Sequence, residues 1–207
     1  MKYYDINQNS EEWFDMRSGR ITSSAVAKVM ANFGKAFGEP AKAYAAHIAL
    51  ERFNGKKIEK DYYTSSVMER GTELEPVARN EYEINEMVEV KNGGFFEKDT
   101  LGDSPDGLVG ENGVIEIKCV IPSTHFKTLK KGGYPSSYKW QIHFHMLVTG
   151  RDWCDFISYC PDFPEAKQLY VFRVDKDTEL QKQMLERIAE FELLIEENIN
   201  LLKNDIQ

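Results

Sequence analysis

The residues of this sequence that are best suited to chemistry are Asp106, Glu116 and Lys118, in the segment SPDGLVGENGVIEIKCV at 104–120. Alternation along an extended strand places Glu116 and Lys118 on one face, two residues apart. Asp106 lies in the turn before a short strand, GLV, and a hairpin at Glu111–Gly113 would bring it alongside Glu116. The opposite face of the strand is apolar and should face the core, with Ile115, Ile117, Cys119 and Ile121.

Two carboxylates beside an ammonium group suit the metal-dependent hydrolysis of a phosphodiester bond. Mg²⁺ takes oxygen ligands at about 2.0–2.1 Å, and Asp106, Glu116 and a main-chain carbonyl would supply part of that set. A bound metal lowers the pKa of its water and stabilises charge on the leaving oxygen. Lys118 would orient or deprotonate the attacking water, or stabilise the phosphate in the transition state. The alternative is a half-exposed strand that carries an ordinary Glu–Lys pair.

The elements that must position these residues follow from apolar spacing, caps and turn residues. Helices are expected from Asn9 or Ser10 to Gly19, from Thr22 to Asn32, over 40–54 with Gly55 beyond, from about Ser65 to Glu86 with interruptions at Gly71 and Pro76, over 136–149 with Gly150 beyond, and from Thr178, where Gln181 completes a capping box, to about Leu202. Strands are expected at 95–99, 107–109, 113–120, 155–160 and 168–175. This order predicts an α/β fold, in which helices flank a central mixed β-sheet, in a single domain over residues 1–207.

Composition limits the function classes. The three cysteines form no CxxC pair, which disfavours a disulfide framework or a zinc site. Neither a secretory signal nor a membrane-spanning run is recognised, so we expect a soluble protein that has no membrane partner. The net charge of −8 is unfavourable for DNA binding unless basic residues gather locally. The candidates for such a surface are Lys127, Lys130, Lys131 and Lys139 together with Arg17, Arg20 and Lys28.

Four ordered blocks resemble one family. The string S-P-D-G-L…E-I-K-C resembles the active-site signature of the PD-(D/E)xK nucleases, whose shared core is that of the restriction endonucleases. Within that superfamily the chain is most similar to the phage lambda exonuclease, or YqaJ-like viral recombinase, family. The other blocks are W-F-D-M-R-S-G-R-I-T-S-S, R-G-T-E-L-E-P-V-A-R, and Y-K-W-Q-I-H-F-H-M-L-V-T-G with D-F-I-S-Y-C-P, so that the resemblance spans about residues 13–161.

The resemblance implies a role for each matching residue. Asp106, Glu116 and the Ile117 main-chain carbonyl would hold Mg²⁺, with Mn²⁺ as a substitute, and Lys118 would be the catalytic lysine. Glu75 would help to hold a second metal through water. The residues that would grip the 5′-terminal phosphate are Arg17, Ser24, Ser104 and Gln141.

The same family implies a 5′→3′ exonuclease that acts on double-stranded DNA ends and leaves a 3′ overhang for phage-type recombination. It also implies a homo-oligomer in the form of a ring-shaped trimer, a single-strand annealing protein as partner, and a place in the cytoplasm of a bacterial host cell. Two other functions are an endonuclease on the same fold and a catalytically dead DNA-binding module. The intact Asp-Glu-Lys set argues against the second of these.

Each carried-over residue also has a simpler explanation. Arg17 and Ser24 lie near helix ends, where such residues cap or pair locally. Glu75 is four residues before Arg79, which suits an ordinary helical ion pair. Gln141 would then be an ordinary exposed helix residue.

The family's second glutamine is replaced by His143 in this chain. His143 and His145 point about 200° apart on a helix, so they form no paired metal site. We expect both histidines to be structural or surface residues.

Overall fold

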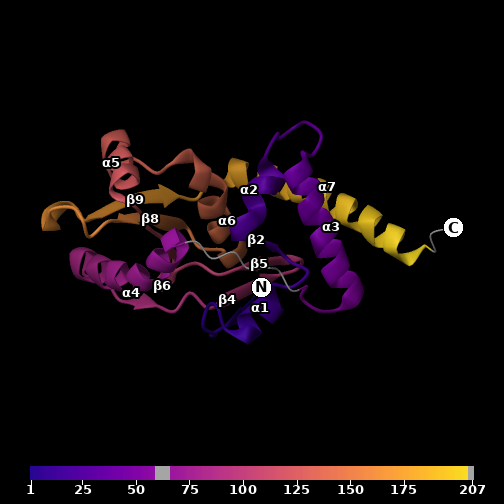
Figure 1. Ribbon diagram of the computed structural model, residues 1–207, viewed down its shortest axis with the longest axis horizontal. Helices are drawn as coiled ribbons and strands as arrows, with labels where there is room; N and C mark the ends of the chain where they lie inside the picture. Colours follow the sequence, from indigo (N-terminus) through magenta and orange to yellow (C-terminus); the bar gives the residue numbers. More distant parts are fainter. Residues whose placement is uncertain (59–65, 205–207) are drawn as a thin grey trace.

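A computed structural model of the chain describes residues 1–58 and 66–204. Within these ranges the strands are divided between two mixed sheets, with helices on their faces (Figure 1). The larger sheet has the strand order β3–β6–β7–β8–β9, and the smaller one has the order β1–β4–β5–β2. The predicted α/β class, with helices flanking mixed β-structure, is confirmed.

The helices are α1 (Glu11–Arg17), α2 (Ser23–Met30), α3 (Glu39–Asn54), α4 (Ser66–Glu86), α5 (Pro122–Lys131), α6 (Lys139–Thr149) and α7 (Thr178–Lys203), with single 3-10 turns η1 (Ser136–Tyr138) and η2 (Glu165–Lys167). The strands are β1 (Lys2–Tyr4), β2 (Ile21–Thr22), β3 (Val90–Lys91), β4 (Phe95–Lys98), β5 (Leu101–Asp103), β6 (Gly107–Val109), β7 (Gly113–Cys119), β8 (Trp153–Tyr159) and β9 (Leu169–Asp175).

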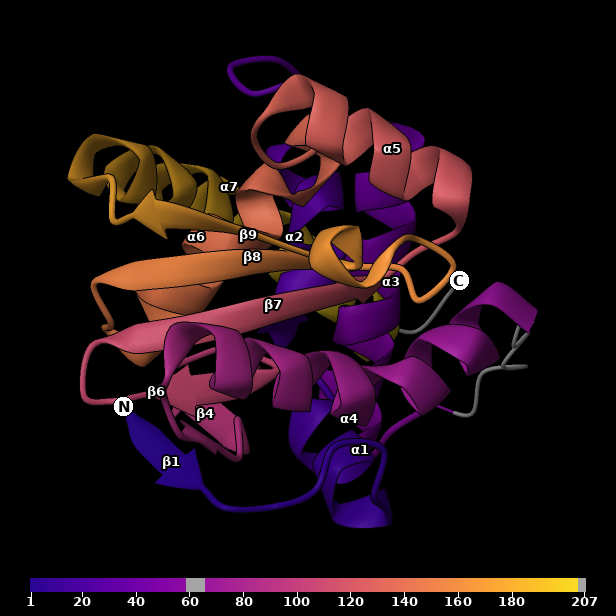
Figure 2. The same cartoon turned by 90° about the vertical axis from the view of Figure 1, so that its left-hand side faces the viewer.

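Strand β7 is the centre of the larger sheet and is covered on both faces. It pairs antiparallel with β6 and parallel with β8. Helix α4 covers one face of this sheet and α6 lies on the other (Figure 2). Ile115 and Ile117 pack with Ala78 and Tyr82 of α4, whereas Val114 packs on the side of α6. Burial on both faces explains why the strand is almost continuously apolar and why its polar residues are conspicuous.

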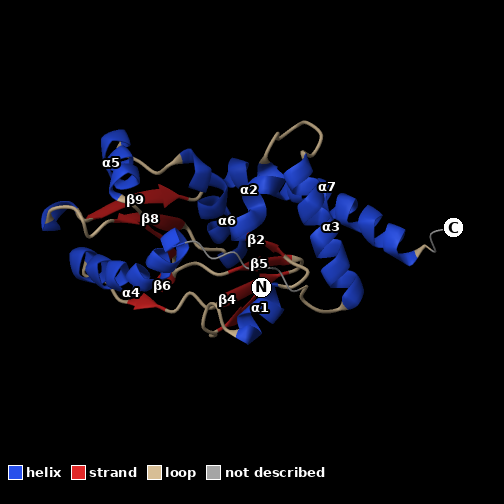
Figure 3. Cartoon of the chain, viewed as in Figure 1, coloured by secondary structure: helices blue, strands red, loops and turns tan. Residues whose placement is uncertain are grey.

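The smaller sheet places β5 next to the start of the β6–β7 hairpin. β4 and β5 are antiparallel neighbours, β1 extends the sheet beyond β4, and β2 pairs in parallel with β5. Strands β1, β2, β3 and β5 were not predicted, because each has only two or three residues, too few to show alternation. The equally short β6 was predicted from the turn residues on either side of it. All the strands are drawn in red in Figure 3, between the surrounding helices.

Several helix boundaries differ from the predictions. Pro76 lies inside α4, which continues through Gly71 and Pro76 without the predicted interruptions, and Ser65 lies outside the described residues. Helix α7 is capped by Asp177, whose side chain accepts from the Leu180 N–H at 2.9 Å, so the predicted Thr178–Gln181 capping box is wrong. At α1 the predicted cap is confirmed and is Ser10, which accepts from the Trp13 N–H at 3.2 Å.

Helix α5 was missed because its sequence, PSTHFKTLKK, is polar. Its signals are a proline in its first turn and Gly132 in the left-handed conformation directly after its last residue. Helix α7 packs along α3, and its C-terminal part extends away from both sheets (Figure 1). No helix in the described ranges has both the length and the apolar character needed to cross a membrane.

Candidate active site

Asp106 is fixed against β7 by two backbone contacts. Its own N–H donates to the Ile115 carbonyl at 3.0 Å, and the Ile117 N–H donates to Asp106 Oδ2 at 2.6 Å. Gly107 is the register partner of Ile115, so the predicted β6–β7 hairpin is present. The hairpin therefore holds Asp106 beside Glu116, and Ile117 provides the main chain between them.

Glu116 and Lys118 form a buried ion pair on β7. The Glu116 side chain is 1% exposed and that of Lys118 is 26% exposed. Lys118 Nζ contacts Glu116 Oε1, and it lies 5.4 Å from the centre of the Tyr138 ring. The alternative of a half-exposed strand with an ordinary surface pair is wrong, because the carboxylate is inside the protein.

A third group, which the sequence did not indicate, contacts the same carboxylate. His145 on α6 is fully buried, and its Nε2 lies 2.7 Å from Glu116 Oε2. Its Nδ1 lies 2.9 Å from both carboxylate oxygens of Asp103, at the end of β5. His145 is buried, as expected of a structural residue, but the sequence did not indicate its contact with Glu116, a predicted metal ligand.

The other histidine is structural as predicted. His143 is buried on the same helix, and burial lowers the pKa of its imidazole. The signal that could have identified His145 is its spacing from Gln141: residues four apart share one helix face. Asp103 could have been noted because it immediately precedes the Ser-Pro-Asp turn.

The carboxyl groups of the site differ strongly in acidity. Burial, followed by the neighbouring Glu116 carboxylate, raises the pKa of Asp106 to about 8. Burial alone would also raise the pKa of Glu116, but the Lys118 ammonium and the hydrogen bond from His145 lower it to about 2. At neutral pH and without a metal ion, Glu116 is thus charged whereas Asp106 is mostly protonated.

The two basic groups are held in their charged forms. Burial opposes the charge on Lys118, but the Glu116 and Asp106 carboxylates raise its pKa above the ordinary value. Burial likewise opposes protonation of His145, yet Asp103 and Glu116 raise its pKa to about 10. An imidazole whose two nitrogens both face carboxylate oxygens donates to both of them when it is protonated.

Glu75 reaches the site from α4. Burial raises its pKa, Arg79 and Lys118 lower it, and Glu116 raises it again, so that Glu75 lies within electrostatic range of the β7 pair. The simpler explanation, a helical ion pair with Arg79, is also present with Glu75 Oε1 and Arg79 Nη2 at 3.5 Å. Arg79 donates to the Asp106 carbonyl as well, and so connects α4 to the hairpin.

The donor groups fit a divalent cation that takes few ligands from side chains. Glu116 Oε1 is buried, and the Lys118 ammonium that contacts it occupies a position that a cation could take. In the described part of the chain, no three His, Cys, Asp or Glu side chains are gathered closely enough to enclose a metal by themselves. Two carboxylates and a main-chain oxygen, completed by water and substrate, are the kind of set that Mg²⁺ accepts.

Two of the four predicted phosphate-binding residues lie together beside a cavity. Arg17 Nη2 donates to Ser24 Oγ at 3.0 Å, and the guanidinium lies 4.2 Å from the centre of the Trp13 ring. The cavity has a volume of about 820 Å³, and these three side chains are among those that line it. The local pairing that offers a simpler explanation for Arg17 and Ser24 is thus present, and it faces an open space.

Ser104 and Gln141 are placed differently. Ser104 is buried, and its Oγ accepts from Trp13 Nε1 at 2.7 Å, so it supports the cavity wall from behind. Ser104 is also two residues before Asp106, which connects the cavity to the hairpin. Gln141 is half-buried in the first turn of α6, on the face that carries His145 one turn later.

The predicted basic residues are divided between several elements. Lys127, Lys130 and Lys131 are exposed on α5, which lies on the opposite side of β7 from α1 in Figure 2. Arg20 pairs with Glu97 at 3.3 Å, and Lys28 Nζ lies 5.6 Å from the centre of the Tyr44 ring. The basic groups therefore flank the site from two sides and do not form one patch.

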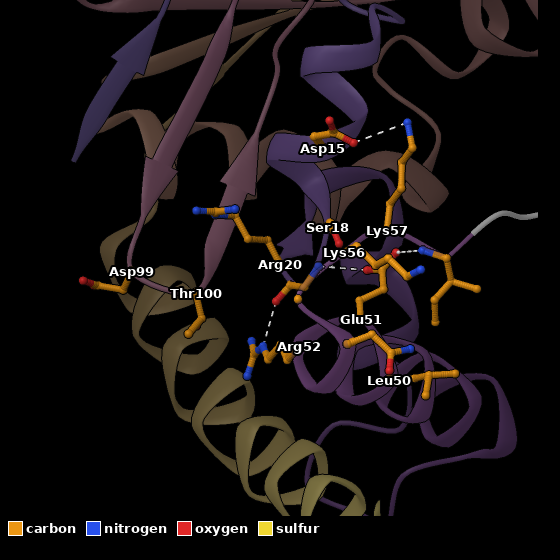
Figure 4. A pocket seen from close by; sticks show the side chains of 14 residues that line it. Asp15, Ser18, Arg20, Leu50, Glu51, Arg52, Lys56, Lys57, Asp99 and Thr100 are labelled. Atoms are coloured by element: carbon orange, nitrogen blue, oxygen red, sulfur yellow. Dashed lines mark hydrogen bonds and ion pairs between the residues drawn. The ribbon is translucent and has the colours of Figure 1, made fainter.

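A larger hollow, of about 950 Å³, lies where α1 meets the end of α3 (Figure 4). Several of its charged groups already have partners: Lys57 pairs with Asp15 at 3.3 Å, and Glu51 accepts from the Gly19 N–H at 2.8 Å. Arg52 donates to the Gly19 carbonyl at 2.7 Å. We assign no chemistry to this hollow, which is lined by neither Glu116 nor Lys118.

The fold and the site together define the class. A mixed sheet whose central hairpin brings Asp106 beside a Glu-x-Lys strand is the arrangement expected of the PD-(D/E)xK nucleases. The family model of the YqaJ-like viral recombinase domain matches residues 12–152. The chain belongs to the YqaJ-like viral recombinase family, and this membership implies nuclease activity.

Solved structures agree with this assignment. The alkaline exonuclease LHK-Exo from Laribacter hongkongensis is 36% identical, with a TM-score of 0.84 over 94% of this chain and 96% of that one, and its complex with dAMP matches equally well. A phage-related exonuclease from Haemophilus somnus 129PT is 15% identical, with a TM-score of 0.69 over 88% of this chain and 96% of that one, and shows the shared fold alone. No curated protein sequence matches the chain.

Proposed function

We propose that the protein is a metal-dependent 5′→3′ exonuclease that resects double-stranded DNA ends and leaves 3′ single-strand overhangs. The observation that carries this proposal is the convergence of Asp106, Glu116 and Lys118 on one buried hairpin. The 36% identity to an alkaline exonuclease supports exonuclease chemistry in particular. The complex of that relative with dAMP supports a nucleoside monophosphate as the released product.

Asp106, Glu116 and the Ile117 carbonyl would hold Mg²⁺, for which Mn²⁺ would substitute. Glu75 would assist at a second position through water. When bound, the metal would activate a water molecule and stabilise negative charge on the scissile phosphate. Asp106, whose pKa is about 8 without a metal, would give up its proton on becoming a ligand.

Before a metal binds, Lys118 would be a protonated ammonium group paired with Glu116. In the absence of a metal its pKa is raised by the two carboxylates, so it is protonated near neutral pH. Once those carboxylates are neutralised by a cation, the cause of the raised pKa is removed, and burial of the ammonium favours a lower pKa. The ammonium can then turn from Glu116 toward the phosphate and the attacking water.

Arg17 and Ser24, supported by Ser104 and joined by Gln141, would bind the 5′-terminal phosphate. A guanidinium beside a hydroxyl group offers charge-assisted hydrogen bonds to phosphate oxygens. The Trp13–Ser104 hydrogen bond connects this cavity to the turn that carries Asp106. Holding the terminal phosphate at a fixed distance from the hairpin would set the polarity of digestion.

The wider assembly is part of the same proposal. We propose a homo-oligomer, as a ring-shaped trimer around the DNA, and a single-strand annealing protein that receives the overhang. The place of action would be the cytoplasm of a bacterial host cell.

The test is digestion of linear duplexes, labelled at either end, beside covalently closed circles. With Mg²⁺ we expect mononucleotides from the 5′-phosphorylated strand of the linear DNA, intact circles, and no product in EDTA. Asp106→Asn should abolish cleavage with the fold retained. The matched control Asp152→Asn, which removes an exposed carboxylate paired with Lys176, should leave cleavage unchanged.

Three outcomes would contradict the proposal. Cleavage of the closed circles would indicate an endonuclease. Release of nucleotides from the 3′ end would reverse the polarity. DNA binding without turnover in Mg²⁺ or Mn²⁺ would indicate an inactive binding module.

A further inference from the structure

A buried polar chain connects the two sheets through the proposed metal ligand. It runs from Asp103 on β5 through the His145 ring on α6 to Glu116 on β7. The exposed fraction of both Asp103 and His145 is 0%, and that of Glu116 is 1%. The three polar side chains are enclosed by protein, so the packing of β5, α6 and β7 fixes their hydrogen bonds.

We propose that His145 is a positioning residue that fixes the Glu116 carboxylate for metal binding, and that Asp103 in turn fixes the His145 ring. This inference rests on the proposed function. The two oxygens of Glu116 are divided: Oε2 lies 2.7 Å from His145 Nε2, whereas Oε1 faces Lys118. With Oε2 held by His145, Oε1 is the oxygen that a cation would take, by displacing the Lys118 ammonium.

The need for such a device follows from the side chain itself. The terminal torsion of a glutamate has broad, weakly defined minima, so the carboxylate plane is set by its partners. Mg²⁺ demands near-ideal octahedral geometry and tolerates misdirected ligands poorly. A hydrogen bond to one oxygen fixes the plane of the carboxylate and the direction of the other oxygen.

Stability alone is a poor explanation for the buried series Asp103–His145–Glu116. The neighbours of His145 along α6 are apolar and buried, including Phe144, Met146 and Leu147. Buried ionic groups gain little over apolar residues of similar volume, because desolvation offsets their attraction. An apolar residue at position 145 would complete that core, but it would leave Glu116 Oε2 unpaired.

The experiment measures Mn²⁺ binding to the DNA-free protein, by calorimetry and by the electron spin resonance of free Mn²⁺. The variants are His145→Gln, which can reach one of the two carboxylates, and the nearly isosteric Asp103→Asn. The control is Tyr82→Phe, which removes a buried 2.7 Å hydrogen bond to Asp155 on the opposite face of the sheet. Thermal unfolding of each variant separates structural damage from loss of positioning.

We expect His145→Gln to weaken Mn²⁺ binding by about 10- to 100-fold and Asp103→Asn to weaken it by a smaller factor. Tyr82→Phe should lower thermal stability and leave the affinity unchanged. For DNA cleavage, kcat should fall at a fixed Mn²⁺ concentration while the KM for DNA stays constant. In a Glu116→Gln background the His145 substitution should have no further effect on Mn²⁺ binding.

Mn²⁺ affinity within about twofold of the wild type in both variants would overturn the inference, because removing a residue that orients a metal ligand lowers metal affinity by a larger factor. Asp103→Asn decides the matter if His145→Gln does not fold. An additional loss of affinity in the Glu116→Gln background would also overturn it, because His145 would then act by another route. A wild-type protein that binds no Mn²⁺ and cleaves no DNA would instead overturn the proposed function, and with it this inference.

Discussion

Replacing Lys118 with methionine should separate stability from catalysis at the site. Removing one member of a buried ion pair costs about 3–5 kcal/mol when the other charge is left unpaired. Here Lys118 is 26% exposed and Glu116 keeps its bond from His145, so we expect a loss of about 2 kcal/mol. For a chain of this size that loss lowers the Tm by about 4–8 °C.

Metal should restore the stability of this variant but not its activity. No ammonium competes for Glu116 Oε1 in the variant, so its Mn²⁺ affinity should equal or exceed that of the wild type. At about 100 times the Kd, binding to the folded state adds about 2.7 kcal/mol, which is more than the loss. Cleavage should remain at least about 100-fold below that of the wild type, because the charge that stabilises the phosphate is gone.

Calorimetric unfolding with and without Mn²⁺, together with a cleavage assay, tests this reasoning. The control is Lys176→Met, which removes a surface ion pair with Asp152 and should change stability by less than about 1 kcal/mol. A metal-free Lys118→Met protein as stable as the wild type would refute the energetic argument. Weaker Mn²⁺ binding by the variant would show that Lys118 and the metal do not compete.

Three further predictions concern other parts of the molecule. A Cβ at Gly113 would lie 2.1 Å from the Trp153 ring, so Gly113→Ala should lower the free energy of unfolding in urea by about 1–3 kcal/mol. Gly71 is inside a helix and a Cβ there would meet open space, so Gly71→Ala should raise the free energy of unfolding by about 0.5–1 kcal/mol. Burial, followed by nearby carboxylates, raises the pKa of Cys119 to about 12, so roughly one thiol in 10⁴ is ionised at pH 8. Alkylation of Cys119 should therefore be slow at pH 8 and should accelerate as the pH is raised toward that pKa. Rapid labelling at pH 8, detected by mass spectrometry, would contradict this. Arg17→Ala should reduce the preference for 5′-phosphorylated over 5′-hydroxyl ends, in kcat/KM, by about 10- to 100-fold, and an unchanged preference would remove Arg17 from the phosphate site.

The β6–β7 hairpin of the candidate site could be predicted because its determinants are local. Asp106, Glu116 and Lys118 lie within 13 consecutive residues, and the turn signals between them specify the pairing. The strand alternation then assigns Glu116 and Lys118 to one face. The error was in burial: alternation suggested one apolar face, whereas α4 and α6 cover both faces.

The polar chain behind Glu116 could not be predicted in the same way. Asp103 and His145 are 42 residues apart and meet only when β5 and α6 pack together. No periodicity of the sequence encodes that contact. Comparing His145 with His143 concerns only their directions on one helix, and it says nothing of contacts with other elements. The very short strands of the smaller sheet, which place Asp103, escaped prediction for the related reason that two or three residues carry no pattern.

The confinement of Asp106, Glu116 and Lys118 to one hairpin has a consequence for how the activity could be altered. The groups proposed to cut the bond belong to one hairpin, whereas Arg17 and Ser24, two of the groups proposed to bind the DNA end, belong to α1 and α2. The Trp13–Ser104 hydrogen bond joins these two assemblies. Redesign of α1 and α2 could therefore change which DNA terminus the enzyme binds while Asp106, Glu116 and Lys118 stay in place, provided that the Trp13–Ser104 hydrogen bond is preserved.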